Sequence, residues 1–77
     1  MKSIQNFTAI IEKEDDGYVA LCPEFEIASQ GDTVEEAKSN LQEAIELFFE
    51  HASKNEIEYR LKNDIFITNM QIAVGQA

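Results

Sequence analysis

The order of strand-like and helix-like segments is the feature that most constrains how this chain can fold. Residues 7–12 and 18–22 are rich in residues that favour strands. An Asp-Gly step lies between them and supplies the residue of positive φ that a tight hairpin turn needs. Pro23 cannot donate to a strand ladder, so it ends the second strand and leaves residues 25–30 as a short third strand. The three segments predict an antiparallel meander.

A long amphipathic helix is predicted directly after the third strand. Thr33 and Glu36 have the spacing of a capping box, and Asp32 adds a negative charge near the positive end of the helix. Apolar residues then recur at spacings of three and four and form one stripe that packs on the sheet. The members of this stripe are Val34, Ala37, Leu41, Ala44, Ile45, Phe48 and Ala52.

The last third of the chain predicts a short helix and a fourth strand. Ser53 and Glu56 have the spacing of a second capping box, and Asn63 can end that helix in a left-handed conformation. Residues 64–74 then form a long apolar strand. A strand that returns through a helical crossover favours a parallel neighbour, so we place it beside the first strand. The expected fold is α+β, with sheet order 3-2-1-4 and the helices on one face.

Length and charge limit the class of protein. The chain has 77 residues and a formal net charge of −9, so we expect a single domain over residues 1–77. Its six Lys and Arg residues are spread along the chain, which argues against direct nucleic-acid binding and suits a basic partner. Negative charge that only keeps the protein soluble is the simpler alternative. One Cys, no apolar signal core and no apolar run of membrane length lead us to expect a cytoplasmic protein.

The acidic residues of the long helix gather on one side. At an advance of about 100° per residue, five glutamates fall within a sector of roughly 100° opposite the apolar stripe. They are Glu35, Glu36, Glu43, Glu46 and Glu50, and neither Lys nor Arg falls inside this sector. The face is either solvated or binds a partner. If it binds, Glu35, Glu43, Glu46 and Glu50 are the predicted contacts.

Residues that could carry catalysis are few, and we predict no enzyme, no cofactor and no metal site. His51 is the only histidine, and we expect it to have a structural or surface role. Cys22 is the only cysteine, and we expect a buried, unreactive thiol. The sequence contains no metal-binding or phosphate-binding motif. Ribonuclease H-like nucleases hold acidic residues on the first strand, the first helix and the fourth strand. Residues 8–11 contain no acid, and Asp64 stands at the beginning of the predicted fourth strand. A metal-dependent nuclease is therefore the least favoured class.

Several short motifs in a fixed order resemble the HicB-like antitoxin family. They are Phe7-Thr-Ala-Ile-Ile-Glu12, Gly17-Tyr18, Cys22-Pro23-Glu24, Ser29-Gln-Gly-Asp-Thr33, Glu36-Ala37 and Glu43-Ala44-Ile45. The match covers residues 7–49 well and the rest of the chain loosely. Residues 25–28 differ from many members, which have a glycine-containing segment there, and this shorter version looks more like the stand-alone, single-domain members.

The resemblance implies a truncated, non-catalytic ribonuclease H-like domain. Members of the family bind a small basic ribonuclease toxin (HicA-like) and mask its RNA-binding face and active site. Many members also carry a C-terminal DNA-binding module that represses their own operon. We expect no such module in this sequence, so the resemblance does not imply operon repression by this chain alone.

A self-assembling structural protein without a toxin partner is the alternative function. Leu47 and Phe49 flank the apolar stripe, and the long last strand could pair across a dimer. A 77-residue chain buries only about 60% of its unfolded surface, so association would stabilise it. We therefore expect a homodimer or a higher homo-oligomer, with Leu47 and Phe49 as candidate contacts.

Overall fold

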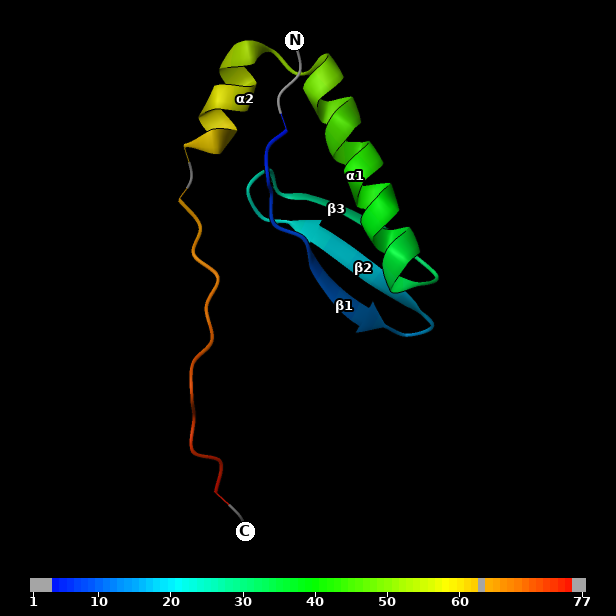
Figure 1. Ribbon diagram of the computed structural model, residues 1–77, viewed down its shortest axis with the longest axis vertical. Coiled ribbons are helices and arrows are strands. Elements are labelled where there is room, and N and C mark those ends of the chain that lie inside the picture. Colours follow the sequence, from blue (N-terminus) through cyan, green and yellow to red (C-terminus); the bar gives the residue numbers. More distant parts are fainter. Residues whose placement is uncertain (1–3, 63, 76–77) are drawn as a thin grey trace.

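The computed structural model describes residues 4–62 and 64–75 and has an α+β architecture (Figure 1). Its elements in chain order are β1 (Ile10–Glu14), β2 (Gly17–Cys22), β3 (Ile27–Gly31), α1 (Val34–His51) and α2 (Lys54–Leu61). The strands form one antiparallel sheet in the order β1-β2-β3. The predicted meander and both helices are confirmed.

The start of β1 differs from the prediction. The sequence places this strand from Phe7, but pairing begins where Ile10 lies opposite Leu21. Extending the same register would put Thr8 opposite Pro23, which has no N–H to donate. The backbone N–H of Thr8 instead donates to the carboxylate of Glu24, at 3.0 Å to Oε2. A side chain thus takes the place of the missing ladder bond.

The hairpin turn has the predicted place but a different residue of positive φ. Glu14 pairs with Gly17, so the loop consists of Asp15 and Asp16. Asp15 has φ of 51°, whereas no glycine has a positive φ in the described structure. Gly17 is required for space, because a Cβ at this position would lie 2.8 Å from the carbonyl oxygen of Gly31. The prediction that the Asp16-Gly17 step supplies the residue of positive φ is wrong, because that residue is Asp15.

β3 also begins later than predicted. Residues 23–26 form a turn, closed where the N–H of Phe25 donates to the carbonyl oxygen of Cys22 at 3.3 Å. Glu26 adopts a positive φ of 56°, and this turn directs the Phe25 side chain into the core rather than along a strand. Phe25 was predicted as a strand residue because the pattern of neighbouring apolar residues does not reveal the turn.

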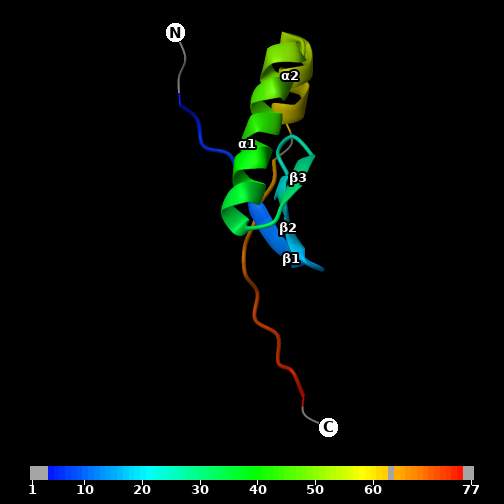
Figure 2. The ribbon, with the colours of Figure 1, turned by 90° about the vertical axis from the view of Figure 1, so that its right-hand side faces the viewer.

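α1 begins as predicted and lies across one face of the sheet, mainly over β3 and β2 (Figures 1 and 2). The hydroxyl of Thr33 accepts a hydrogen bond from the N–H of Glu36 at 3.0 Å. The Glu36 carboxylate accepts from the N–H of Asp32 at 2.9 Å, one residue before the position of a usual capping box. The amide of Asn40 donates to the carbonyl oxygen of Gln30 at 2.8 Å and ties the helix to β3.

The core lies between α1 and the sheet. Its fully buried residues are Ala20, Cys22, Phe25, Ala37 and Leu41. Most of them are small, so aromatic rings supply much of the packed volume. Phe25 is the centre of this aromatic cluster, with ring centroids 5.0 Å from Phe7, 5.5 Å from Phe48 and 5.2 Å from Phe49.

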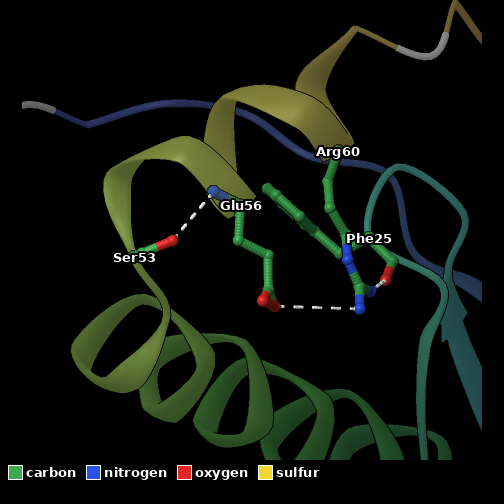
Figure 3. Close-up of polar contacts among 4 residues, drawn as sticks. All are labelled: Phe25, Ser53, Glu56 and Arg60. Carbon is green, nitrogen blue, oxygen red and sulfur yellow. Dashed lines mark hydrogen bonds and ion pairs between the residues drawn. The ribbon is translucent and has the colours of Figure 1, made fainter.

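α2 is attached to the domain through Arg60 (Figure 3). The hydroxyl of Ser53 caps the helix by accepting from the N–H of Glu56 at 3.1 Å, as predicted. The guanidinium of Arg60 donates to the carbonyl oxygen of Phe25 and lies 5.0 Å from the centroid of the Phe48 ring. These contacts fix where the chain leaves α2. The predicted helix end at Asn63 lies outside the described residues.

The fourth strand and the order 3-2-1-4 are not formed in the described structure. Residues 64–75 have no assigned strand and run away from the domain, with all of their side chains exposed (Figures 1 and 2). The radius of gyration is 15.6 Å, against about 11–12 Å for a compact domain of this length. The apolar pattern of residues 64–74 indicates a tendency to form a strand, but it does not show which chain would supply the neighbouring strand.

Neither described helix is long and apolar enough to cross a membrane.

Candidate functional site

The four glutamates predicted as partner contacts are exposed on the outer side of α1. We call Glu35, Glu43, Glu46 and Glu50 the acidic face. They lie on the side of the helix away from Ala37 and Leu41, which are buried against the sheet. Because α1 is capped at Thr33 and packed along its length, the acidic face is held on a rigid element. Glu36, in contrast, uses its carboxylate at the helix start.

No ion pair joins a basic side chain to the acidic face among the described residues. Among the described residues the recorded ion pair is between Glu56 and Arg60 on α2, with 4.0 Å between the carboxylate oxygen and the guanidinium nitrogen. Helix surfaces usually carry charges of both signs so that i, i+4 pairs form, as Glu56 and Arg60 do on α2. The acidic face therefore keeps a local excess of negative charge.

A second acidic region lies at the end of the sheet near the start of α1 (Figure 1). Glu14, Asp15, Asp16, Asp32 and Glu36 line a shallow depression there. No group of three or more potential metal ligands is formed within the described part of the chain. The region extends the negative surface beyond the helix and offers no preformed coordination site.

An apolar groove runs along the other flank of α1. It lies between the extended residues 4–9 and the two helices and has a volume of about 1160 Å³. Its apolar lining includes Phe7, Leu41, Ile45, Phe49, Ile57 and Leu61. Glu46 and Glu50 of the acidic face also line the groove, together with Lys38. The groove and the acidic face therefore share a border.

The structure separates the two predicted oligomer contacts. Leu47 and Phe49 are two positions apart on α1, and this spacing turns their side chains about 160° away from each other. Phe49 lines the groove and also packs on Phe25, whereas Leu47 does not line the groove. Leu47 is 49% exposed and Phe49 is 36% exposed. These residues do not form one patch on a single chain.

The two candidate reactive side chains have surroundings that differ from each other. Cys22 is fully buried, and its thiol donates to the Glu24 carboxylate at 3.4 Å. Burial raises the pKa of Cys22, and the hydrogen bond to Glu24 and the charge of that carboxylate raise it further. The thiolate needed for nucleophilic chemistry is thus disfavoured. His51 is exposed at the end of α1.

Comparisons with known proteins place the chain in a family. No family model and no solved structure matches it. A UPF0150 protein of Helicobacter pylori strain J99 is 38% identical over 66 residues, which cover 84% of this chain and 92% of that relative. The chain belongs to the UPF0150 family. Two UPF0150 proteins of Synechocystis are 55% and 58% identical over 51 and 45 residues, or 64% and 56% of this chain.

The alignments with the two Synechocystis UPF0150 proteins span 65% and 62% of those relatives, which is less than two thirds of either. The name UPF0150 states no activity, substrate or partner. The α+β fold is shown by the structure alone, and the resemblance to HicB-like antitoxins stays a prediction.

A set of hydrogen bonds to Glu24 is a feature of this UPF0150 protein that was not predicted from the sequence. The Glu24 carboxylate accepts from the N–H of Thr8 at 3.0 Å and from its hydroxyl at 2.8 Å, as well as from the Cys22 thiol. Desolvation raises the pKa of Glu24, but the hydrogen bonds from Thr8 and the backbone outweigh it, and the net pKa is lowered. The Cys-Pro-Glu motif is the only local signal. These hydrogen bonds join Thr8, which precedes β1, to the turn before β3.

We expect Glu24→Gln to lower the free energy of unfolding by about 1.5–3 kcal/mol at pH 7, because it removes charge-assisted hydrogen bonds. Since the pKa of Glu24 is lowered in the folded state, this stability is present above the unfolded pKa of roughly 4.3. It is lost as the pH falls through the folded pKa. Urea unfolding at pH 7 and at pH 3 should show the difference from wild type shrinking in acid. Glu12→Gln, at an exposed strand position, is the control, and a difference that did not change with pH would contradict the assignment.

Proposed function

We propose that this UPF0150 protein is a non-catalytic, cytoplasmic protein-binding module of the HicB-like antitoxin type. It neutralises a small basic ribonuclease toxin by covering the surface with which the toxin binds RNA. The observation that carries the proposal is the acidic face of α1, whose four exposed carboxylates have no basic side chain paired with them in the described residues. The family resemblance of residues 7–49 gives the kind of partner.

Charge complementarity explains why such a face would select a ribonuclease. A protein that binds RNA presents Lys and Arg side chains to the phosphates. Carboxylates on a rigid helix can compete for the same cations, and attraction between surfaces of opposite charge speeds their encounter. The net charge of −9 strengthens this attraction over the whole molecule. Because α1 is already ordered, binding requires little additional ordering of the contact residues.

The fold is consistent with a partner-binding role derived from a ribonuclease H-like domain. The three antiparallel strands followed by a helix match the opening part of that fold. In our proposal the sheet reaches the order 3-2-1-4 when a strand from residues 64–74 pairs with β1. The remaining edge of the sheet and the acidic face then lie on different surfaces, so completing the sheet leaves α1 free for the toxin.

The combined replacement of Glu35, Glu43, Glu46 and Glu50 by Gln should weaken toxin binding by roughly 100- to 1,000-fold, at about 1 kcal/mol for each lost charge contact. Its binding should also depend less on salt, because fewer ion pairs form. The measurement is capture of a small basic protein from the source cells by the tagged chain, at low and at high salt, followed by titration of the purified partner.

A matched variant carries four Glu→Gln changes at exposed positions elsewhere, namely Glu12, Glu14, Glu26 and Glu58. It has the same net charge as the first variant, so any long-range effect is shared by both. We expect the matched variant to keep most of the affinity. An equal loss in both variants would place the binding site away from the acidic face.

A self-assembling protein without a toxin partner is the second candidate. The observation that favours it is the exposed apolar segment after α2, which includes Phe66, Met70 and Val74. Capture experiments separate the two candidates, since this one yields only further copies of the chain. Self-association by itself is compatible with either function.

A further inference from the structure

The sheet ends in an open edge at β1. β1 is an outer strand, and in an antiparallel ladder alternate residues of such a strand point their N–H and C=O groups away from the sheet. The opposite edge is partly covered, because Asn40 on α1 donates to the carbonyl oxygen of Gln30 on β3. α1 packs least on β1. The apolar groove is lined by residues 4–9, which lead directly into β1, and by the two helices. The β1 edge is therefore the place where a further strand would fit.

The segment 64–75 has the pattern of that missing strand. Side chains alternate between two faces of an extended chain. One face presents Phe66, Met70, Ile72 and Val74, which are 87%, 82%, 68% and 86% exposed. The other face is more polar after Ile67, with Asn69 and Gln71. An uncovered strand of this composition is a site of pairing with another chain, which natural proteins normally protect.

We propose that two copies of this chain exchange their C-terminal segments. The apolar side chains of residues 64–75 from one copy lie in the groove of the other copy, and the segment extends the sheet at the free edge of β1. Residues 65–75 contain no charged side chain, so this part of the chain can approach a second, strongly acidic copy without repulsion. The same lack of cations makes the segment unsuited to anionic membranes or nucleic acids.

Reciprocal exchange accounts for both open surfaces at once. In the described structure the groove is open and the segment 64–75 is unpaired. A two-fold dimer fills both grooves with both segments, so neither remains free to bind a third chain and start a filament. An extended segment of twelve residues exposes on the order of 1,900 Å², at about 1.45 Å² per dalton. If each of the two segments buries a third of this area, and each groove buries a similar area against it, the total buried surface exceeds the roughly 1,600 Å² of a standard interface.

Light scattering of the full chain tests the dimer. We expect wild type to have twice the chain mass of 8.7 kDa and the double variant Phe66→Asp/Met70→Asp to be a folded monomer. The matched variant Asn69→Asp/Gln71→Asp adds the same charge on the other face of the segment and should remain a dimer. A monomeric wild type, or the same mass for both double variants, would overturn the proposal.

A disulfide test distinguishes exchange from folding back onto the same chain. In the double variant Gln42→Cys/Met70→Cys, one thiol lies in the groove and the other on the apolar face of the segment. Oxidation should double the mass on a non-reducing gel. An internal disulfide at the mass of one chain would place the segment in its own groove and contradict exchange. The proposal does not depend on the toxin, because neither test changes the acidic face.

Discussion

Phe25→Ala is expected to lower the free energy of unfolding by about 3–5 kcal/mol, the range for truncating a buried Phe. The Phe25 ring is fully buried and is the centre of the aromatic cluster formed with Phe7, Phe48 and Phe49. A domain of this length has a total stability of roughly 4–11 kcal/mol, at 0.05–0.15 kcal/mol per residue. The variant should therefore be largely unfolded at low urea concentrations.

The control for Phe25→Ala is Leu47→Ala, which truncates a side chain that is 49% exposed. We expect a change within about 0.5 kcal/mol there, as for most surface substitutions. Urea unfolding followed by circular dichroism measures both, at one protein concentration because dimer formation would add to stability. Equal midpoints for the two variants would show that Phe25 is not the centre of the core.

Gly31→Ala is expected to lower the free energy of unfolding by about 2–3 kcal/mol, at the upper end of the usual range for overpacking. A Cβ at Gly31 would lie 2.5 Å from the backbone nitrogen of Ala37 and 2.8 Å from the carbonyl carbon of Glu36. These are backbone atoms of α1 and cannot rotate away, so the helix would have to move off β3. The loss arises from space alone, since Gly31 does not have a positive φ.

The chain provides a matched substitution at Gly75, where an added Cβ meets no atom within 4 Å. Gly75→Ala should leave the urea midpoint unchanged. If Gly31→Ala were equally neutral, the close approach between the end of β3 and the first turn of α1 would be wrong.

The parts of the fold that depend on neighbours in sequence could be predicted. Thr33 and Ser53 cap their helices through bonds to residues three positions later, so both helix starts are visible in the sequence. The two-residue loop between β1 and β2 is likewise local. Such features need no knowledge of the rest of the molecule.

The parts that depend on distant residues could not be predicted. β1 begins at Ile10 because Thr8 bonds to the side chain of Glu24, sixteen residues away. Arg60 attaches α2 to the carbonyl oxygen of Phe25, and no sequence pattern links those positions. The apolar residues after Asp64 predicted a fourth strand that the described structure does not form, and their periodicity does not tell which chain would supply its neighbour.

Only the part of the candidate site that depends on local helical spacing could be predicted. Helical spacing is enough to place Glu35, Glu43, Glu46 and Glu50 on one side of α1 and to expect exposure opposite the apolar stripe. The groove that borders Glu46 and Glu50 could not be foreseen, because it arises where residues 4–9 pass beside two helices.

Inhibition of RNA cleavage is the measurement that tests the central claim most directly. The basic protein captured by the chain would be incubated with RNA while the purified chain is added in increasing amounts. We predict that cleavage stops near one chain per toxin, and that the variant with Gln at Glu35, Glu43, Glu46 and Glu50 fails to stop it. Cleavage that continues at full rate when every toxin molecule is bound would contradict neutralisation.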